Sequence, residues 1–164
     1  MLTTLRTHYP NYQCVIAGAP GIEAEFYTPF VQGYKAEVLF GQTYDILAAA
    51  DFALVTSGTA TLETALIGTP QIVCYRSIGS PLINWAFSQF PISYFSLVNL
   101  ILDTPLVEEL LAAKATPKHL HKAIERLLAS TQEISEGYAR LQSQLGRVPA
   151  ARTAAQIITR SIIH

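Results

Sequence analysis

The chain has 164 residues, of which 50% are hydrophobic and only 14% are charged, and its formal net charge is −1. This composition excludes intrinsic disorder, which requires low hydrophobicity and high net charge. It also argues against nucleic acid as a partner, because 11 basic residues balance 12 acidic ones and no basic run occurs. The length suits one domain of about 100–200 residues. The charged fraction lies well below the roughly 25% of an ordinary soluble domain, so either the surface is thinly charged or part of it faces something other than water.

The first two thirds of the chain alternate short apolar runs with helix-compatible segments. Residues 1–6 resemble the end of a helix and lack the basic-then-apolar order of a signal peptide. Apolar runs bounded by turn residues predict strands at 12–17, 36–40, 51–56, 71–75 and 93–97. Helices are predicted at 22–32 (where Pro29 should interrupt or end the helix early), at 44–50, at 60–67 with Gly68 as C-cap, and at 81–89. Near-continuous apolar strands separated by helices indicate an α/β, Rossmann-like fold, with a parallel sheet covered on both faces.

The last third is predicted to be helical. Thr116-Pro117 is typical of an N-cap followed by proline at the first helical position, and apolar residues then recur at the spacing of an amphipathic helix. Two more helices are expected at 132–145 and 150–163, the last with an apolar face of Ala and Ile. Cys14 and Cys74 lie far apart in apolar segments, which favours reduced core residues of a cytosolic protein over a disulfide.

Residues 77–102 carry no charged side chain, which raises the question of a membrane span. A spanning helix needs about 20 mostly apolar residues, but Pro81, Pro91 and five serines interrupt this run. Because Pro91 would break a helix in its middle, we predict no transmembrane segment. Two interpretations remain: a buried helix followed by a buried strand, or a surface that lines an interface or a cleft for an apolar ligand.

The segment 54–63, L-V-T-S-G-T-A-T-L-E, has the order strand, small-residue turn, helix. Such turns lie at the carboxyl ends of strands, where open α/β sheets bind ligands, and the helix N-terminus is a ready anion site. Gly58 would let a phosphate approach the backbone, and Ser57, Thr59 and Thr61 would supply hydroxyl donors. Glu63 lies one helical turn after Thr59 on the same face, where its carboxylate can accept two hydrogen bonds from a vicinal diol such as ribose.

This arrangement suits a nucleoside diphosphate, although an ordinary helix start with a surface glutamate is the alternative, since Ser, Thr and Gly commonly precede helices. The pattern is neither a P-loop nor G-x-G-x-x-G. No metal site is predicted: His119 and His121 lie two residues apart on a helix and would face different sides, and Asp45 and Asp51 have no partner at ligand spacing.

The string S-G-T-A-T-L-E at 57–63, followed by Tyr75-Arg76 and by S-L-V-N-L at 96–100, resembles lipid-A-disaccharide synthase. This is a glycosyltransferase family with the two-domain GT-B fold, and the resemblance covers nearly the whole chain from about residue 12. Val98 stands where the family has proline, and the following Asn99 is retained.

The resemblance implies condensation of UDP-2,3-diacylglucosamine with 2,3-diacylglucosamine 1-phosphate, which forms the β-1′,6-linked lipid A disaccharide and releases UDP without a metal or other cofactor. In a GT-B enzyme the C-terminal half holds the nucleotide donor, whereas the N-terminal half holds the acceptor and, in this family, the carboxylate assigned as base. The chain resembles the donor-binding half alone and lacks the Leu-Pro-Gly-Ser-Arg segment that normally opens this half. We therefore expect no catalytic residue in it.

The donor-binding residues that the resemblance implies are Ser57, Gly58, Thr59, Ala60, Glu63, Arg76 and Asn99. The turn 57–60 would cradle the diphosphate and Glu63 would hold the ribose. Arg76 would offset phosphate charge, with a plain surface role as the alternative, and Asn99 would contact the donor near the cleft.

By the same resemblance, residues 1–130 would form a Rossmann-like UDP-sugar-binding domain, and helices within 131–164 would cross to the missing N-terminal domain. The expected partners are the UDP-sugar donor, the acceptor (mainly through the missing domain), that domain itself and the cytoplasmic face of the inner membrane. The apolar face of the last helix would be covered by that domain or in a homodimer.

We expect the isolated chain to bind UDP weakly and not to turn over. Two alternatives stay open: another UDP-sugar GT-B enzyme such as an epimerase, and a stand-alone nucleotide-sugar-binding or interaction module without catalysis.

Overall fold

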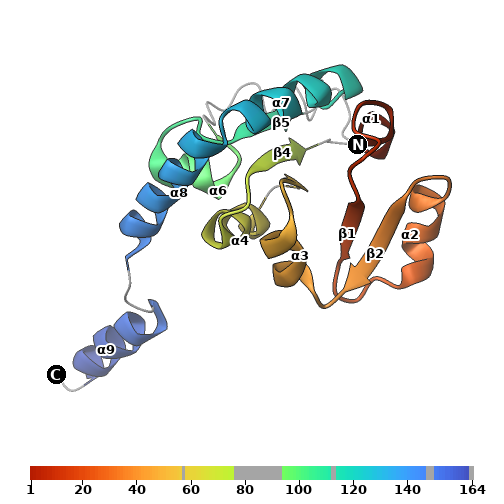
Figure 1. Cartoon of the computed structure of the whole chain (residues 1–164). Coiled ribbons are helices and arrows are strands. Elements are labelled where there is room, and N and C mark those ends of the chain that lie inside the picture. The colour runs from red at the N-terminus through yellow and green to blue at the C-terminus, as the bar shows by residue number, and fades with distance from the viewer. Residues whose placement is uncertain (57, 76–93, 112–113, 147–149, 163–164) are drawn as a thin grey trace, which may run out of the picture.

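Figure 1 shows the computed structural model of the chain, which describes residues 1–56, 58–75, 94–111, 114–146 and 150–162. Its strands are β1 (Cys14–Gly18), β2 (Ala36–Phe40), β3 (Ala53–Val55), β4 (Gln71–Tyr75) and β5 (Glu108–Leu111). Its helices are α1 (Leu2–His8), α2 (Ala24–Val31), α3 (Thr43–Ala49), α4 (Thr59–Ile67), α6 (Leu97–Leu102), α7 (Pro117–Ala129), α8 (Thr131–Leu145) and α9 (Ala150–Ile162). The predicted α/β class is confirmed.

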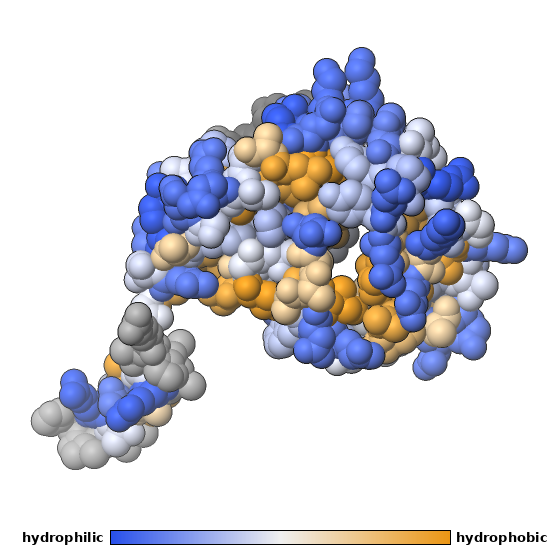
Figure 2. Space-filling view, in the orientation of Figure 1, coloured by the Kyte–Doolittle hydropathy of each residue, from blue (hydrophilic) through white to orange (hydrophobic). Residues whose placement is uncertain are grey.

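The described strands form two parallel sheets instead of one. β1 pairs with β2, and β3, β4 and β5 pair in that order. In Figure 1 the β1–β2 pair with α2 stands apart from the larger sheet, which carries α4, α6, α7 and α8. Figure 2, in the same orientation, shows the molecule hollowed between these two parts, with hydrophobic residues at the rim. Parallel pairing is therefore confirmed, but one continuous sheet is not formed by these strands.

The core lies around the larger sheet. In β4, Ile72 and Val73 are fully buried and Cys74 is nearly so, whereas most of β1 is only half-buried. Burying one such aliphatic side chain is worth about 1.5–3 kcal/mol, and the buried hydrophobic core combines residues of β4 and β5 with residues of α7 and α8. Cys14 and Cys74 are both free thiols, as predicted, but only Cys74 lies in the core and Cys14 is half-buried.

Helix α8 belongs to this core. The Tyr138 hydroxyl accepts a hydrogen bond from Gln71 Nε2 and donates one to the Thr69 carbonyl, each at 3.2 Å, and burial raises the pKa of Tyr138 to about 12. In contrast, residues 152–161 of α9 are exposed. Whether the chain divides at 130/131 stays a prediction. Within the described ranges, no helix combines the length and the apolar character that crossing a membrane would require.

Several local predictions are confirmed and two are wrong. Gly68 ends α4 in the left-handed conformation, with φ of 100°, and Thr116 caps α7 by accepting from the His119 N–H. Pro29 does not end α2, which continues to Val31, because a proline near the end of a helix removes only one backbone hydrogen bond.

The strand predicted at 93–97 is also wrong. Ser96 caps α6, which begins at Leu97, and the fifth strand is β5. The helix predicted at 81–89, and most of the charge-free run, lie outside the described residues.

A buried polar network joins α6 to β5. Glu109 accepts hydrogen bonds from the N–H groups of Phe95 and Ser96 and from Asn99 Nδ2, all at 2.9 Å. The Asn99 amide also donates to the Val107 carbonyl at 2.8 Å and accepts from the Val107 N–H at 2.9 Å. Asn99 is 1% exposed, so these bonds replace its hydration completely.

We predict that Asn99→Ala lowers the free energy of unfolding by about 2–3 kcal/mol, because the buried N–H and C=O groups of Val107 lose their partner and the half-buried Glu109 carboxylate loses one of its three donors. Gln132→Ala is the matched control, since it removes an exposed amide-to-carboxylate bond to Glu136 and should cost less than about 0.5 kcal/mol. Urea titrations of both variants measure the difference; equal losses would contradict the proposed weight of the buried network.

Candidate functional site

The turn from β3 into α4 has the geometry of an anion site. Gly58 precedes α4 with φ of 103° and ψ of −156°, a region of backbone space that is essentially restricted to glycine. An added Cβ would meet nothing within 4 Å, so the need for glycine comes from the backbone conformation and not from crowding. Gly58 has no side chain with which to cap α4, which leaves the first N–H groups and the positive end of the helix dipole directed at the turn.

Thr61 connects this turn to α6. Its hydroxyl donates to the Gly58 carbonyl at 2.8 Å and accepts from the Leu97 N–H at 3.2 Å, and the side chain is fully buried. Gly58 also forms a parallel bridge with Ser96. The N-terminal ends of α4 and α6 therefore lie side by side. The expectation that Thr61 supplies a hydroxyl to a ligand is wrong, because the protein itself uses that hydroxyl.

Two of the predicted residues, Ala60 and Glu63, lie at a cavity of about 980 Å³. Gly58, Thr59 and Ala60 are exposed at the start of α4, and Glu63 is half-buried one turn further on. Ala60 and Glu63 both line the cavity. Within the described part of the chain, the Glu63 carboxylate makes no hydrogen bond or ion pair, so its acceptor sites are open toward this space.

Several polar residues that line the same cavity were not in the predicted donor-binding set, among them the three named next. Thr56 follows β3, and Gln42 and Thr43 lie at the start of α3. The sequence signal for Gln42 is the Gly41-Gln42 turn that closes an apolar strand and precedes a helix, which is weak by itself because such turns are common. Two predicted residues, Ser57 and Arg76, lie outside the described residues.

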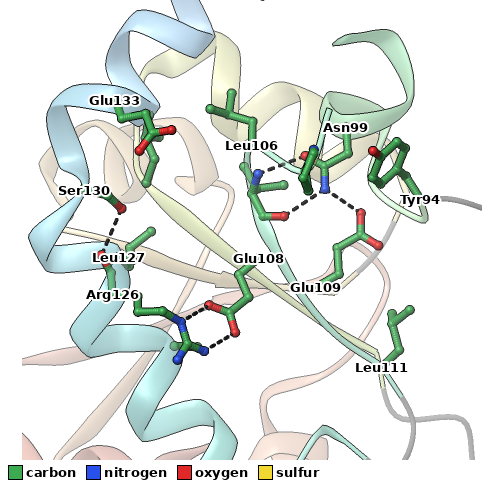
Figure 3. A pocket seen from close by; sticks show the side chains of 14 residues that line it. Tyr94, Asn99, Leu106, Glu108, Glu109, Leu111, Arg126, Leu127, Ser130 and Glu133 are labelled. Atoms are coloured by element: carbon green, nitrogen blue, oxygen red, sulfur yellow. Dashed lines mark hydrogen bonds and ion pairs between the residues drawn. The ribbon is translucent and has the colours of Figure 1, made fainter. Parts of the chain in front are cut away.

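Asn99 lies at a second cavity, of about 510 Å³, on the other side of α6. Figure 3 shows its amide directed at Glu109 and at the backbone beside Leu106, and the Arg126 guanidinium directed at Glu108. The Arg126 Nε–Glu108 Oε2 distance is 3.0 Å. Because these polar groups satisfy one another, this cavity is a structural feature of the α6–β5 contact. Asn99 holds α6 in place, and its contact with a donor stays a prediction.

We predict that Thr61→Val lowers the free energy of unfolding by about 1–3 kcal/mol, because the Leu97 N–H loses its acceptor. Thr64→Val is a matched control in the same helix, equally buried. Its hydroxyl only donates to the Ala60 carbonyl. That carbonyl keeps its helical N–H partner in the variant, so the free energy of unfolding should fall by only about 0.5–1 kcal/mol. Urea unfolding of the two variants compares them; a larger loss for Thr64→Val would rule out the bridging role of Thr61.

Comparison with known proteins identifies a family. A family model described as "Lipid-A-disaccharide synthetase" matches residues 2–160. The chain is similar to the lipid-A-disaccharide synthase of Rhodospirillum centenum, at 37% identity over 99% of this chain and 43% of the relative. It is 36% identical to the lipid-A-disaccharide synthase of Gloeothece citriformis, over 77% of this chain and 34% of the relative. It is 39% identical to that of Syntrophus aciditrophicus, over 70% of this chain and 30% of the relative.

This chain thus spans less than half the length of these curated relatives. The match nevertheless extends over nearly all of its own residues, including the β3–α4 turn. The chain belongs to the lipid-A-disaccharide synthetase family.

Proposed function

We propose that this chain is the donor-binding part of a lipid-A-disaccharide synthase and that it binds UDP and UDP-sugars at the β3–α4 turn. The observation that carries the proposal is the combination of the glycine-started helix α4 with Glu63 one turn below, facing the same cavity. The family assignment supports an acylated UDP-sugar, UDP-2,3-diacylglucosamine, as the donor. The acceptor would be a diacylglucosamine 1-phosphate.

The diphosphate would lie across the N-terminus of α4. Backbone N–H groups and the helix dipole there favour negative charge. They gain importance as the sugar is transferred, because the departing UDP carries the developing negative charge. In that step the 6-hydroxyl of the acceptor forms a bond to C1 of the donor sugar, the bond from C1 to the β-phosphate oxygen breaks, and a base takes the hydroxyl proton. This part of the chain supplies the leaving-group side.

The ribose would lie against Glu63. An ionised carboxylate only accepts hydrogen bonds, and the 2′- and 3′-hydroxyls of a ribose are two donors at matching spacing. Gln42, at the same cavity, has an amide that can both donate to and accept from a uracil edge.

The remainder of the reaction belongs to parts of a longer protein. The acceptor hydroxyl, its base and the acyl chains of both substrates would contact a second domain, and acylated substrates would bring the enzyme to the cytoplasmic face of the inner membrane as a peripheral protein. We therefore expect this chain alone to bind UDP without forming disaccharide.

Glu63→Ala should weaken UDP binding about 5- to 150-fold, which corresponds to loss of about 1–3 kcal/mol of hydrogen bonding. Calorimetric titration of the wild-type chain and the variant with UDP and with 2′-deoxy-UDP tests the ribose contact directly. The wild type should prefer UDP, and the variant should bind both nucleotides alike. Glu37→Ala, an exposed site of the same charge on β2, is the control. If Glu63→Ala kept the preference for UDP over 2′-deoxy-UDP, Glu63 would not hold the ribose.

Gly58→Ala should reduce UDP affinity at least tenfold, because alanine adopts the Gly58 conformation only at a cost of about 1–3 kcal/mol and the first N–H groups of α4 would shift. Gly68→Ala, at the opposite end of the same helix, also forces a left-handed backbone, at about 1–2 kcal/mol. It should lower the urea midpoint but leave UDP affinity unchanged. Equal loss of affinity in both variants would exclude a specific role for the Gly58 turn.

A further inference from the structure

Tyr75 is the exposed end of an otherwise buried strand. The first four residues of β4 are buried, whereas Tyr75 is 37% exposed. The pair Tyr75-Arg76 is one of the strings behind the family resemblance, yet Tyr75 has no role in the expected donor-binding set. One exposed aromatic residue is ordinary on a protein surface, so a role for Tyr75 has to come from its position.

The strand register places Tyr75 beside the candidate site. Val73 pairs with Val55, the last residue of β3, so Tyr75, two residues later, lies level with the turn that follows β3. Side chains alternate along a strand, which puts Tyr75 on the same face of β4 as Gln71. The Gln71 amide donates to the Thr61 carbonyl, in the first turn of α4, at 2.8 Å. Tyr75 therefore lies on the α4 side of the sheet, at the edge where α4 begins.

Phe95 connects Tyr75 to this turn. The two rings stack, with centroids 6.5 Å apart and planes inclined by 19°. The next residue, Ser96, forms a parallel bridge with Gly58, and the Glu109 carboxylate holds the Phe95 N–H at 2.9 Å. Tyr75 and Phe95 thus form an aromatic surface, the Tyr75–Phe95 surface, next to the start of α4.

Glu63 and the Tyr75–Phe95 surface lie on different sides of this helix start. Helix α4 packs against both α3 and α6. Glu63 faces the cavity that β1 and α3 line, whereas neither Tyr75 nor Phe95 lines that cavity, and Phe95 leads into α6. In a UDP-sugar the ribose and the sugar are attached to opposite ends of the diphosphate. With the ribose at Glu63 and the diphosphate across the N-terminus of α4, the sugar emerges toward the Tyr75–Phe95 surface.

The Tyr75–Phe95 surface suits an apolar part of that sugar. Aromatic side chains supply a large apolar area at a low cost in conformational entropy. The neighbouring Glu109 carboxylate is already engaged by three donors, so it does not require a polar ligand group. A 2,3-diacylglucosamine carries one acyl group on the carbon next to C1, the carbon that is bonded to the diphosphate, and the other one carbon further on. The part of each chain nearest the sugar ring would meet the surface first.

We propose that the Tyr75–Phe95 surface binds the acyl groups of the donor, close to their attachment to the sugar ring, and so selects acylated UDP-sugars over unacylated ones. The proposal rests on the proposed function, because it takes the positions of the ribose and the diphosphate from it. It adds an element of donor selectivity to this chain, on the side of α4 away from Glu63.

Calorimetric titrations of the chain with three ligands test the proposal: UDP, UDP-glucosamine, and UDP-glucosamine that carries butanoyl groups at positions 2 and 3. Butanoyl groups are short enough to keep the ligand monomeric. The wild type should bind the dibutanoyl ligand about 5- to 30-fold more tightly than UDP-glucosamine, which corresponds to about 1–2 kcal/mol for one well-packed aromatic contact. Tyr75→Ala should remove most of this preference and leave the affinity for UDP unchanged.

Two further variants separate the ring from other effects. Tyr75→Phe should keep the preference, because it keeps the ring. Tyr44→Ala is the matched control: Tyr44 is 62% exposed on α3 and is not among the residues that line the cavity, so all three affinities should equal those of the wild type. If Tyr75→Ala does not fold, Tyr75→Thr, which also lacks the ring but favours a strand, takes its place.

Two results would overturn this proposal and leave the proposed function intact: a wild type that binds UDP without preferring the dibutanoyl ligand, or a Tyr75→Ala variant that keeps the full preference. An equal loss of affinity for all three ligands in Tyr75→Ala would also overturn it, because Tyr75 would then only shape the turn before α4. A wild type that does not bind UDP at all would refute the proposed function itself, and the acyl-group contact with it.

Discussion

The carboxylate of Glu109 is the interaction on which the region of the candidate site depends. It accepts two backbone N–H groups at the start of α6 and the side-chain amide of Asn99, and hydrogen bonds to a charged acceptor are stronger than neutral ones. Helix α6 is thereby tied to β5, and the Leu97 N–H of α6 reaches Thr61 at the start of α4. The turn that begins α4 is therefore connected through α6 to β5, the edge strand of the larger sheet.

This arrangement holds the start of α4 by contacts with other elements, while Gly58 provides no side-chain cap. A helix start that is held by tertiary contacts, with a glycine in a conformation that other residues avoid, can present its first N–H groups to an external anion. The half-buried Glu63 carboxylate adds an acceptor one turn below. Preorganisation of this kind is what a glycosyltransferase needs on the leaving-group side, because donors that are already oriented stabilise the departing diphosphate without reorganisation.

The low charge of the sequence has a structural counterpart in apolar surface that remains uncovered. Phe26 and Phe30 of α2 and Ile157 and Ile158 of α9 are each more than half exposed, and the facing edges of β1 and β3 enclose a large apolar cavity. The core is built around β4, while the β1–β2 pair is less buried. The split between the β1–β2 pair and the β3–β4–β5 sheet thus leaves part of the apolar surface uncovered.

The sequence by itself determined the elements whose signals are local. Strands β2 and β4 coincide with the predicted ranges 36–40 and 71–75, because an apolar run bounded by turn residues defines a strand without help from distant parts of the chain. The Gly68 and Thr116 caps are equally local. The turn before α4 is predicted from one contiguous string of residues, and the family resemblance from three short ones, 57–63, 75–76 and 96–100.

Only the tertiary structure decided the rest, because it depends on residues far apart in sequence. Strand β5 contains Glu108 and Glu109, which argue against a buried strand until Arg126 and the start of α6 are seen to pair with them. Thr61 and Asn99 have polar side chains that suit a ligand equally well, and only the structure shows that they bond to the backbone of Leu97 and Val107. Likewise, the break between β1 and β3 follows from strand order across the sheets, a property that no local pattern of residues encodes.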